Sequence, residues 1–408
     1  MKRFLIFVVP LFALVLGGCA SDPENPEGGE GANEESVVER FMPQGFFQET
    51  EKGSIWKSED GGRTFAVRST VDEQRRIEKA DILDFEFHPT RPQAVIISTQ
   101  DHGIFKTENG GESWIPIPFP PRRIYSFILD RRDPDRRLFA SGVIENRGRI
   151  FRSDDEGVNW TPIYVEPGTG TTIASLAQDP RNPDVLYAGT SAGTLVKSVD
   201  AGATWKNIGE TVDGVISKIF FDTEESNYVY LLLFSQQMLL SRDGGETWVE
   251  WDEEIDAEVD AKNREAAELL KQGKIEAAQA ARNEANAIRQ REKDSEPPRT
   301  MIALVPDPSR SGVLYAGGKK GLYRSTDFGK FWERLDIIES AEKFPIRSIA
   351  VNPTNPSEIV FVAGRAFYRS EDGGVTWSVI PLSTDRPPAH IEYDPFDSRF
   401  LFLGLRNL

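Results

Sequence analysis

The chain has 408 residues, with 65 acidic side chains against 48 lysines and arginines, so its formal net charge is −17. Such a charge gives a long-range field that repels nucleic acid and anionic membrane surfaces, so neither is an expected partner. The single cysteine excludes intramolecular disulfides, and packing alone must hold the fold. The length is large for one ordinary core and fits a repeat architecture.

The N-terminus has the pattern of an export signal. Lys2 and Arg3 precede an apolar run, Phe4 to Leu16, that is too short to cross a bilayer as a mature helix. The run ends in Leu-Gly-Gly-Cys, which resembles the lipobox of bacterial lipoproteins. This resemblance implies a lipoprotein signal peptide over residues 1–18 and lipidation of Cys19. The alternative is a free thiol in a plain secretory signal.

Residues 19–49 are expected to form the lipid anchor and a flexible linker. The segment from Ser21 to Ser36 is rich in Glu, Gly, Pro and Asn and cannot bury enough apolar surface to fold. Ala20, rather than Asp, follows the cysteine, which favours delivery to the outer membrane where the organism has one. We therefore expect an extracytoplasmic, lipid-anchored protein of the cell envelope.

An eight-residue motif of the form S-x-D-x-G-x-T-W recurs along the rest of the chain. Seven copies begin at Ser58, Thr107, Ser153, Ser198, Ser241, Ser325 and Ser370. Their starts lie 49, 46, 45, 43, 84 and 45 residues apart, so every interval fits one repeat except the fifth. That interval carries roughly 40 extra residues by the period of the repeat.

The motif resembles the Asp-box, also called the bacterial neuraminidase repeat. Its Ser and Asp side chains accept hydrogen bonds from nearby backbone N–H groups, its Gly takes a positive φ, and its terminal aromatic packs between sheets. Six of the eight tryptophans occupy that last position. We therefore interpret the central Asp or Asn of each box as structural; these residues are Asp60, Asn109, Asp155, Asp200, Asp243, Asp327 and Asp372.

Each repeat predicts four short strands, which make one propeller blade. Before each box an apolar strand ends in a Pro-rich turn and a second strand begins, as in the segment from Asp179 to Gly189. The chain ends in such a strand pair without a box, whereas the first box lacks a clear pair before it. Strands from the two ends should therefore complete one blade. The sequence predicts an all-β, monomeric, seven-bladed β-propeller over residues 50–408, closed by N- and C-terminal strands.

Residues 253–298 interrupt this pattern with a segment of Ala, Glu, Lys, Arg and Gln that is broken at Gly273. It predicts a solvent-exposed helical hairpin between blades, because thin apolar stripes suffice to pair two helices. The stripes comprise Val259, Ala266, Leu270, Ile275, Ala278, Ala281 or Arg282, Ala285 and Ile288. The hairpin is either a spacer or a partner-binding arm. Its position in the repeat places it on the face opposite the Asp-boxes.

That face also receives the loops between the second and third strands, and it is the candidate binding face. Its loops are basic although the protein is acidic. These cations either form a surface that binds an anionic or acidic partner, or they are simply solvated charges. The cations are Arg75, Arg76, Arg122, Arg123, Arg147, Arg149, Lys319, Lys320, Lys343, Arg365 and Arg386.

No motif for catalysis, metal binding or a cofactor is recognisable. The sequence has no Ser-His-Asp arrangement, phosphate-cradling loop or metal-ligand cluster, and His88, His102 and His390 fall in different blades. His88 occupies a turn position held by Asp or Asn in other repeats, so its expected role is structural. Glycoside hydrolysis needs two carboxylates across a cleft, and the sequence cannot locate such a pair.

Asp-box propellers occur in sialidases, xyloglucanase-type glycoside hydrolases, sortilin-type receptors and the photosystem II stability and assembly factor. The chain resembles the xyloglucanases in its blade sequences and the assembly factor in its plan of one seven-bladed propeller, a lipoprotein signal and an arginine-rich face. Fold alone does not choose between these functions. We expect a non-catalytic binding or assembly module that docks an envelope protein or glycan; the alternative is a sialidase- or xyloglucanase-like hydrolase.

Overall fold

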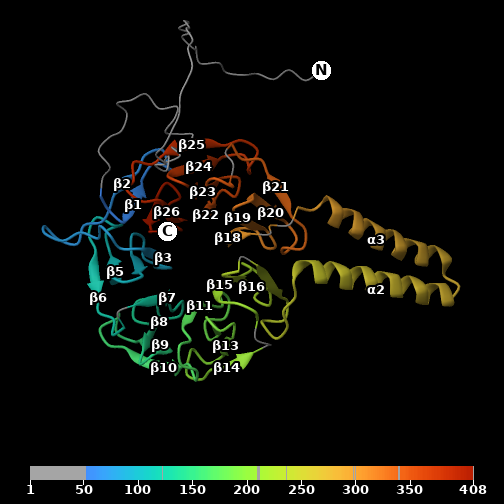
Figure 1. The fold of residues 1–408 in the computed structure, drawn as a ribbon, viewed down its shortest axis with the longest axis horizontal. Helices are drawn as coiled ribbons and strands as arrows, with labels where there is room; N and C mark the ends of the chain where they lie inside the picture. Colours follow the sequence, from blue (N-terminus) through green and yellow to red (C-terminus); the bar gives the residue numbers. More distant parts are fainter. Residues whose placement is uncertain are drawn as a thin grey trace, which may run out of the picture. The chain divides into compact units, whose positions relative to one another are not determined.

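The computed structural model describes residues 52–407, except 122, 209–211, 236, 297, 299, 339 and 340. The predicted signal peptide, the linker with Cys19, and Arg122 thus lie outside the described residues. The described strands form seven antiparallel sheets arranged around a central axis (Figure 1). The predicted seven-bladed β-propeller is confirmed.

Each blade is built outward from an inner strand A, followed by a strand B. The A strands are β3 (Ile82–Phe87), β7 (Ile124–Leu129), β11 (Ile173–Gln178), β15 (Ile216–Phe221), β18 (Met301–Pro306), β22 (Ile346–Val351) and β26 (Pro388–Tyr393). The B strands are β4 (Val95–Thr99), β8 (Leu138–Ile144), β12 (Leu186–Thr190), β16 (Val229–Leu233), β19 (Leu314–Gly318), β23 (Ile359–Ala363) and β27 (Leu401–Leu405). We number the blades 1 to 6 in this order and call the last one the closing blade.

Strand C ends in the Asp-box, and strand D forms the outer edge. The C strands are β5 (Gly103–Thr107), β9 (Arg147–Ser153), β13 (Leu195–Ser198), β17 (Met238–Ser241), β20 (Gly321–Ser325), β24 (Ala366–Ser370) and, in the closing blade, β1 (Ile55–Ser58). The D strands are β6 (Ile115–Ile117), β10 (Thr161–Val165), β14 (Lys206–Ile208), β21 (Glu333–Leu335), β25 (Ser378–Pro381) and β2 (Ala66–Val67). Blade 4 has no strand D among the described residues; only Val249 bridges to Leu240 there.

The two ends of the propeller meet in the closing blade. Strand β1 pairs antiparallel with β27, in a register that joins Ile55 to Gly404 and Ser58 to Leu401. Strands from both ends of the propeller thus complete one sheet, as predicted, and this pairing closes the ring.

The core is a ring of seven apolar clusters, each between two neighbouring blades. Between the closing blade and blade 1, for example, Phe402, Phe85 and Trp114 pack together with little or no exposed surface. Several B strands are buried along their whole length, because both faces of a blade contact another blade. This explains their continuous rather than alternating apolar sequences.

The Asp-boxes have the predicted turn chemistry. In the last box, the Ser370 hydroxyl accepts a hydrogen bond from the Gly374 N–H at 2.8 Å and donates to Asp372 at 2.8 Å. Asp372 also accepts from the Thr376 N–H at 2.8 Å and from the Thr376 hydroxyl at 2.6 Å. Gly374 has a φ of +93°, which favours glycine. These bonds satisfy the turn internally.

The segment from 253 to 298 contains the predicted helical hairpin. Helices α2 (Trp251–Lys271) and α3 (Ile275–Asp294) are separated by a turn at Gly273 and extend away from the ring (Figure 1). Val259, Ala266 and the three α3 alanines of the predicted stripe are buried, whereas Leu270 and Ile275 near the tip are exposed. Among the described residues, no helix is long and apolar enough to cross a membrane.

The expected position of the hairpin, on the face opposite the Asp-boxes, is wrong. Its base packs on the Asp-box of blade 5, where Phe331 joins Ile255, Val259 and Ala285 in one apolar cluster. Phe331 stands where most boxes have Thr or Ser, so no hydroxyl reaches Asp327 from that position; Arg291 of α3 instead pairs with Asp327 at 2.6 Å. The hairpin begins soon after Val249, where blade 4 would need a strand D, and so it leaves the ring from its rim.

Candidate functional site

The inner strands line a central channel that contains the most concentrated group of titratable side chains in the described part of the protein. Two cavities of about 910 and 830 Å³ share Asp84, Glu86 and Lys218 in their walls, and together they touch all seven inner strands. Asp84, Lys218 and His390 are each the third residue of an inner strand, and Glu86 and Glu392 are each the fifth. We call these five residues the channel cluster.

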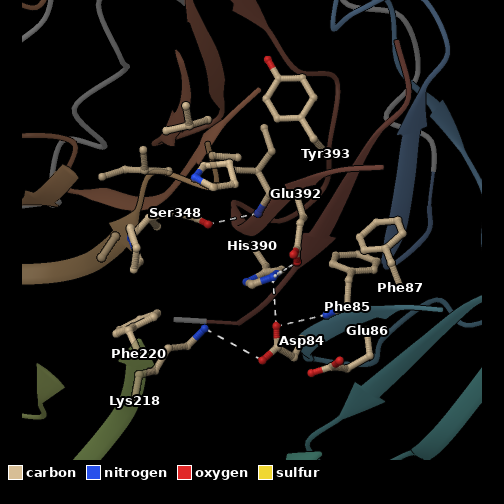
Figure 2. Close-up of a pocket in the computed structure, with 18 of the residues that line it drawn as sticks. Asp84, Phe85, Glu86, Phe87, Lys218, Phe220, Ser348, His390, Glu392 and Tyr393 are labelled. Carbon is tan, nitrogen blue, oxygen red and sulfur yellow. Dashed lines mark hydrogen bonds and ion pairs between the residues drawn. The ribbon is translucent and has the colours of Figure 1, made fainter. Parts of the chain in front are cut away.

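The imidazole of His390 lies between two carboxylates (Figure 2). Its Nε2 atom is 3.2 Å from Asp84 Oδ1 and 3.3 Å from Glu392 Oε2. From the far side of the channel, Lys218 Nζ approaches Asp84 Oδ2 to 4.0 Å. The side chain of His390 is only 13% exposed, whereas Asp84 and Glu392 are 35% and 41% exposed to the channel. The cluster is therefore internal but in contact with water.

Interactions between the charged side chains of this cluster set their protonation states. Burial alone would raise the pKa of Asp84, but Lys218 and His390 outweigh it and hold that pKa at about 2. Burial opposes charging of His390 as well, yet its hydrogen bonds with Asp84 and Glu392 raise its pKa to about 9. At neutral pH these two residues form an imidazolium–carboxylate ion pair that joins blade 1 to the closing blade.

In the other two carboxyl groups, burial outweighs the nearby positive charges. Burial, with a smaller contribution from the charge of Asp84, raises the pKa of Glu86 to about 8. Burial also raises the pKa of Glu392 despite its contact with His390. Glu86 is consequently protonated at neutral pH, and it can donate rather than only accept a hydrogen bond.

Two chemistries are open to this arrangement. Asp84, His390 and Glu392 offer one ligand atom each, all within 4.8 Å of one another, and a carboxylate–imidazole set of this kind can hold a divalent cation when the histidine is neutral. The same atoms also satisfy one another as an ion pair. Lys218 already balances the negative charge of Asp84. Ion pairing among these side chains therefore accounts for the arrangement of the described residues.

A second group of charges lies nearer the end of the channel where the inner strands begin. We call this end, which carries the B–C and D–A connections, the loop face. Arg347 is the second residue of β22, and Arg406 directly follows β27; both line the larger cavity. The guanidinium of Arg406 donates a hydrogen bond to the amide oxygen of Gln100 at 3.3 Å. Neither arginine forms an ion pair with any described residue.

Most cations of the predicted binding face are exposed on the loop face, but several already have acidic partners. Arg123 pairs with Asp101 at 2.9 Å. Similar pairs join Arg75 to Asp72, Arg149 to Glu145 and Lys320 to Glu342. The exposed cations with no ion pair to a described residue are Arg76, Arg147, Lys319 and Lys343.

Two further predicted residues are engaged within the protein. Arg386 is largely buried and links segments from the two ends of the propeller. Its guanidinium donates hydrogen bonds to Ser54 Oγ at 2.8 Å and to the Glu78 carbonyl at 2.9 Å. Arg365 is exposed and donates to the Thr384 carbonyl at 3.0 Å. His88 is structural as expected, because its Nδ1 atom accepts the Arg91 N–H at 3.0 Å, as an Asp or Asn does in the equivalent turns.

The channel cluster and the pair of arginines were not predicted from the sequence. The recognisable motifs are the boxes and the turns, whereas the channel cluster and Arg347 lie on inner strands, and Arg406 directly follows β27. A signal does exist at the third position of the inner strand, where Ser126, Ser175 and Ser348 in three blades correspond to Asp84, Lys218 and His390 in three others. Charged residues at this strand position, which lines a narrow channel, indicate a cluster of charged side chains.

Comparison with known proteins supports both predicted resemblances. The BNR-Asp box repeat family matches residues 322–335. Xyloglucanase Xgh74A of Acetivibrio thermocellus is 24% identical over 72% of this chain, which spans only 37% of that enzyme. The photosystem II assembly protein Ycf48 of Thermosynechococcus vestitus is 26% identical over 48% of this chain and 50% of its own length.

A solved structure of YCF48 bound to D1 peptide shares the fold with a TM-score of 0.54 at 15% identity, and the match covers 81% of this chain and 94% of that one. This chain therefore covers well under two thirds of the xyloglucanase but nearly all of the YCF48 chain. The protein is a seven-bladed β-propeller built from BNR-Asp box repeats, and its structural neighbours include both GH74 xyloglucanases and YCF48.

Proposed function

We propose that this protein is a lipid-anchored, extracytoplasmic binding propeller that docks an acidic segment of an envelope protein on its loop face. The observation that carries the proposal is the pairing of the channel carboxylates with His390. Asp84 and Glu392 share the His390 imidazole at 3.2 and 3.3 Å instead of facing each other across an open groove. Glycoside hydrolysis requires carboxylates separated by room for a sugar bond, about 5 to 9 Å.

The loop face offers what docking requires. Arg76 and Lys319 lie in loops, and Arg147 is the first residue of strand β9; all three are exposed and have no ion pair with a described residue. Unpaired cations in a protein of net charge −17 attract an acidic partner and orient it during encounter. The complex of YCF48 with a D1 peptide provides a precedent in this fold for binding a protein segment.

The anchoring part of the proposal rests on the sequence around Cys19. A diacylated cysteine followed by a polar tether would hold the propeller close to a membrane while leaving its loop face free to meet partners. Replacement of Cys19 by serine should move the protein from the membrane fraction to the soluble extracytoplasmic fraction. Retention of the variant in membranes would refute lipid anchoring.

The alternative function is hydrolysis of a glycan. It is favoured by the 24% identity with a xyloglucanase over 72% of this chain. Xyloglucan and sialylated oligosaccharides are the substrates to assay, with Asp84→Asn and Glu392→Gln as variants. Turnover by the original chain that either variant abolishes would replace the docking proposal with a hydrolase.

Docking is tested by affinity capture from detergent-solubilised envelopes with the full chain. The variant Arg76→Glu/Arg147→Glu/Lys319→Glu should lose a captured protein, because it reverses three charges of the loop face. A matched control, Lys206→Glu/Lys274→Glu/Lys293→Glu, reverses three exposed charges on an outer strand and on the hairpin. Equal capture by both triple variants would refute docking through the loop face.

A further inference from the structure

Two cations at the loop-face end of the channel form no ion pair with a described residue. Arg347 and Arg406 line the same cavity of about 910 Å³, and Arg406 also borders the second cavity. Both are only partly exposed. They come from neighbouring sheets: Arg347 is the second residue of the inner strand β22 in blade 6, and Arg406 directly follows strand β27 of the closing blade.

Their lack of an ion pair distinguishes them from two other arginines of this end, Arg123 and Arg149. Arg123 and Arg149 each pair with a carboxylate at 2.9 and 2.8 Å. Arg406 instead donates to a neutral amide, and Arg347 has no hydrogen bond or ion pair with a described residue. Burial lowers the pKa of Arg347, and the nearby positive charge of Arg406 lowers it further. Guanidinium groups stay protonated in proteins, so the repulsion persists until an anion enters.

We propose that Arg347 and Arg406 form a binding site for a carboxylate group at the loop-face mouth of the channel. The site deepens the proposed docking function and rests on it, since it would hold an acidic side chain or chain end of the docked segment. Guanidinium groups present paired N–H donors that match a planar carboxylate.

The same chemistry also fits a free small carboxylate, so two probes are required. The first is a fluorescein-labelled Gly/Ser peptide that ends in Asp-Glu, compared with the amidated peptide ending in Asn-Gln. The second is citrate, followed by calorimetry. Both are measured with the full chain in detergent micelles, in which the propeller retains its anchor.

We expect Arg347→Gln and Arg406→Gln each to weaken binding of the acidic peptide by about tenfold or more, since each removes a charge-assisted hydrogen-bond donor. Lys206→Gln is the matched control, because this exposed cation of strand β14 lies outside the cavities and the loop face and should change the affinity less than about twofold. The thermal midpoint of Arg347→Gln should equal or exceed that of the original chain, which separates lost binding from lost folding.

The outcomes distinguish the site from the wider docking proposal. If citrate binds through both arginines and the peptide does not, the carboxylate site stands with a small-molecule ligand and docking through it is refuted. If neither probe binds, or if all variants bind equally, the site is refuted. Capture of an envelope protein that depends on the exposed loop cations but not on Arg347 or Arg406 would keep the docking function and overturn this inference.

Discussion

Replacement of Glu86 by glutamine should make the protein more stable at neutral pH. The wild-type carboxyl group is buried beside the ionised Asp84, and the two effects together raise its pKa from 4.5 to about 8. In the unfolded chain the same group ionises freely at pH 7. Folding must therefore bind a proton at Glu86, whereas a glutamine is neutral in both states.

The expected size follows from the two pKa values. Between 4.5 and pH 7 lie 2.5 units, and each unit corresponds to about 1.4 kcal/mol, which gives an upper value of about 3.4 kcal/mol. Water in the channel screens part of this effect, so we expect about 1.5 kcal/mol. The folded pKa is raised, and the penalty therefore is absent below pH 4.5, grows as pH rises, and becomes constant above about pH 8.

Urea unfolding of both chains at pH 4, 7 and 8.5 measures this difference, because urea adds no ions that would screen the cluster. The midpoint of Glu86→Gln should coincide with that of the wild type at pH 4 and exceed it by a few tenths molar at pH 8.5. Glu73→Gln, an exposed residue of the loop face, is the control and should show no such trend. A Glu86→Gln chain that is equally or less stable at pH 8.5 would refute the electrostatic reasoning.

Three further predictions concern other parts of the fold. His390→Asn should destabilise the propeller below pH 6.5 and lose this effect as pH rises through about 9, because the folded pKa is raised and the charged imidazole binds Asp84 only below it; urea midpoints across this range measure it. Ser370→Ala should cost about 1 to 3 kcal/mol in urea unfolding, since the Gly374 N–H loses its buried acceptor, and an unchanged midpoint would contradict this. Ala285→Glu inserts a charge into the packed base of the hairpin and should reduce the helical circular dichroism signal while leaving the ring folded.

The repeat pattern predicted the propeller because each box carries its own turn chemistry. The bonds of Ser370, Asp372 and Gly374 lie within five residues of one another, and the other boxes repeat them, so local sequence determines local structure. The blade count and the closure followed from counting complete and incomplete repeats. These features depend on short-range contacts and on repetition, and both can be recognised in a single sequence.

The sites depend instead on contacts across the ring. Asp84 and His390 are about 300 residues apart in the chain and meet only because the first and last inner strands are neighbours. The base of the hairpin is a similar case, although the sequence did contain a signal. Phe331 replaces the hydroxyl residue of the box, and an apolar side chain at an otherwise polar turn position indicates that something covers it.

The third position of the inner strands explains why the channel cluster belongs to the architecture of the ring. In blade 2 the Ser126 hydroxyl accepts the Leu176 N–H of the next inner strand at 2.9 Å, and in blade 6 Ser348 accepts the Ile391 N–H at 3.1 Å. At the same position between the closing blade and blade 1, His390 and Asp84 form their ion pair.

A hydroxyl–amide bond between neighbouring blades is thus replaced by a charged bond between the closing blade and blade 1. A charge-assisted bond is stronger than a neutral one. The ion pair of Asp84 and His390 should therefore tolerate the loss of its charge less well than the ring tolerates the loss of any single serine. This ion pair then contributes to stability, and the two arginines nearer the loop face remain available for a ligand.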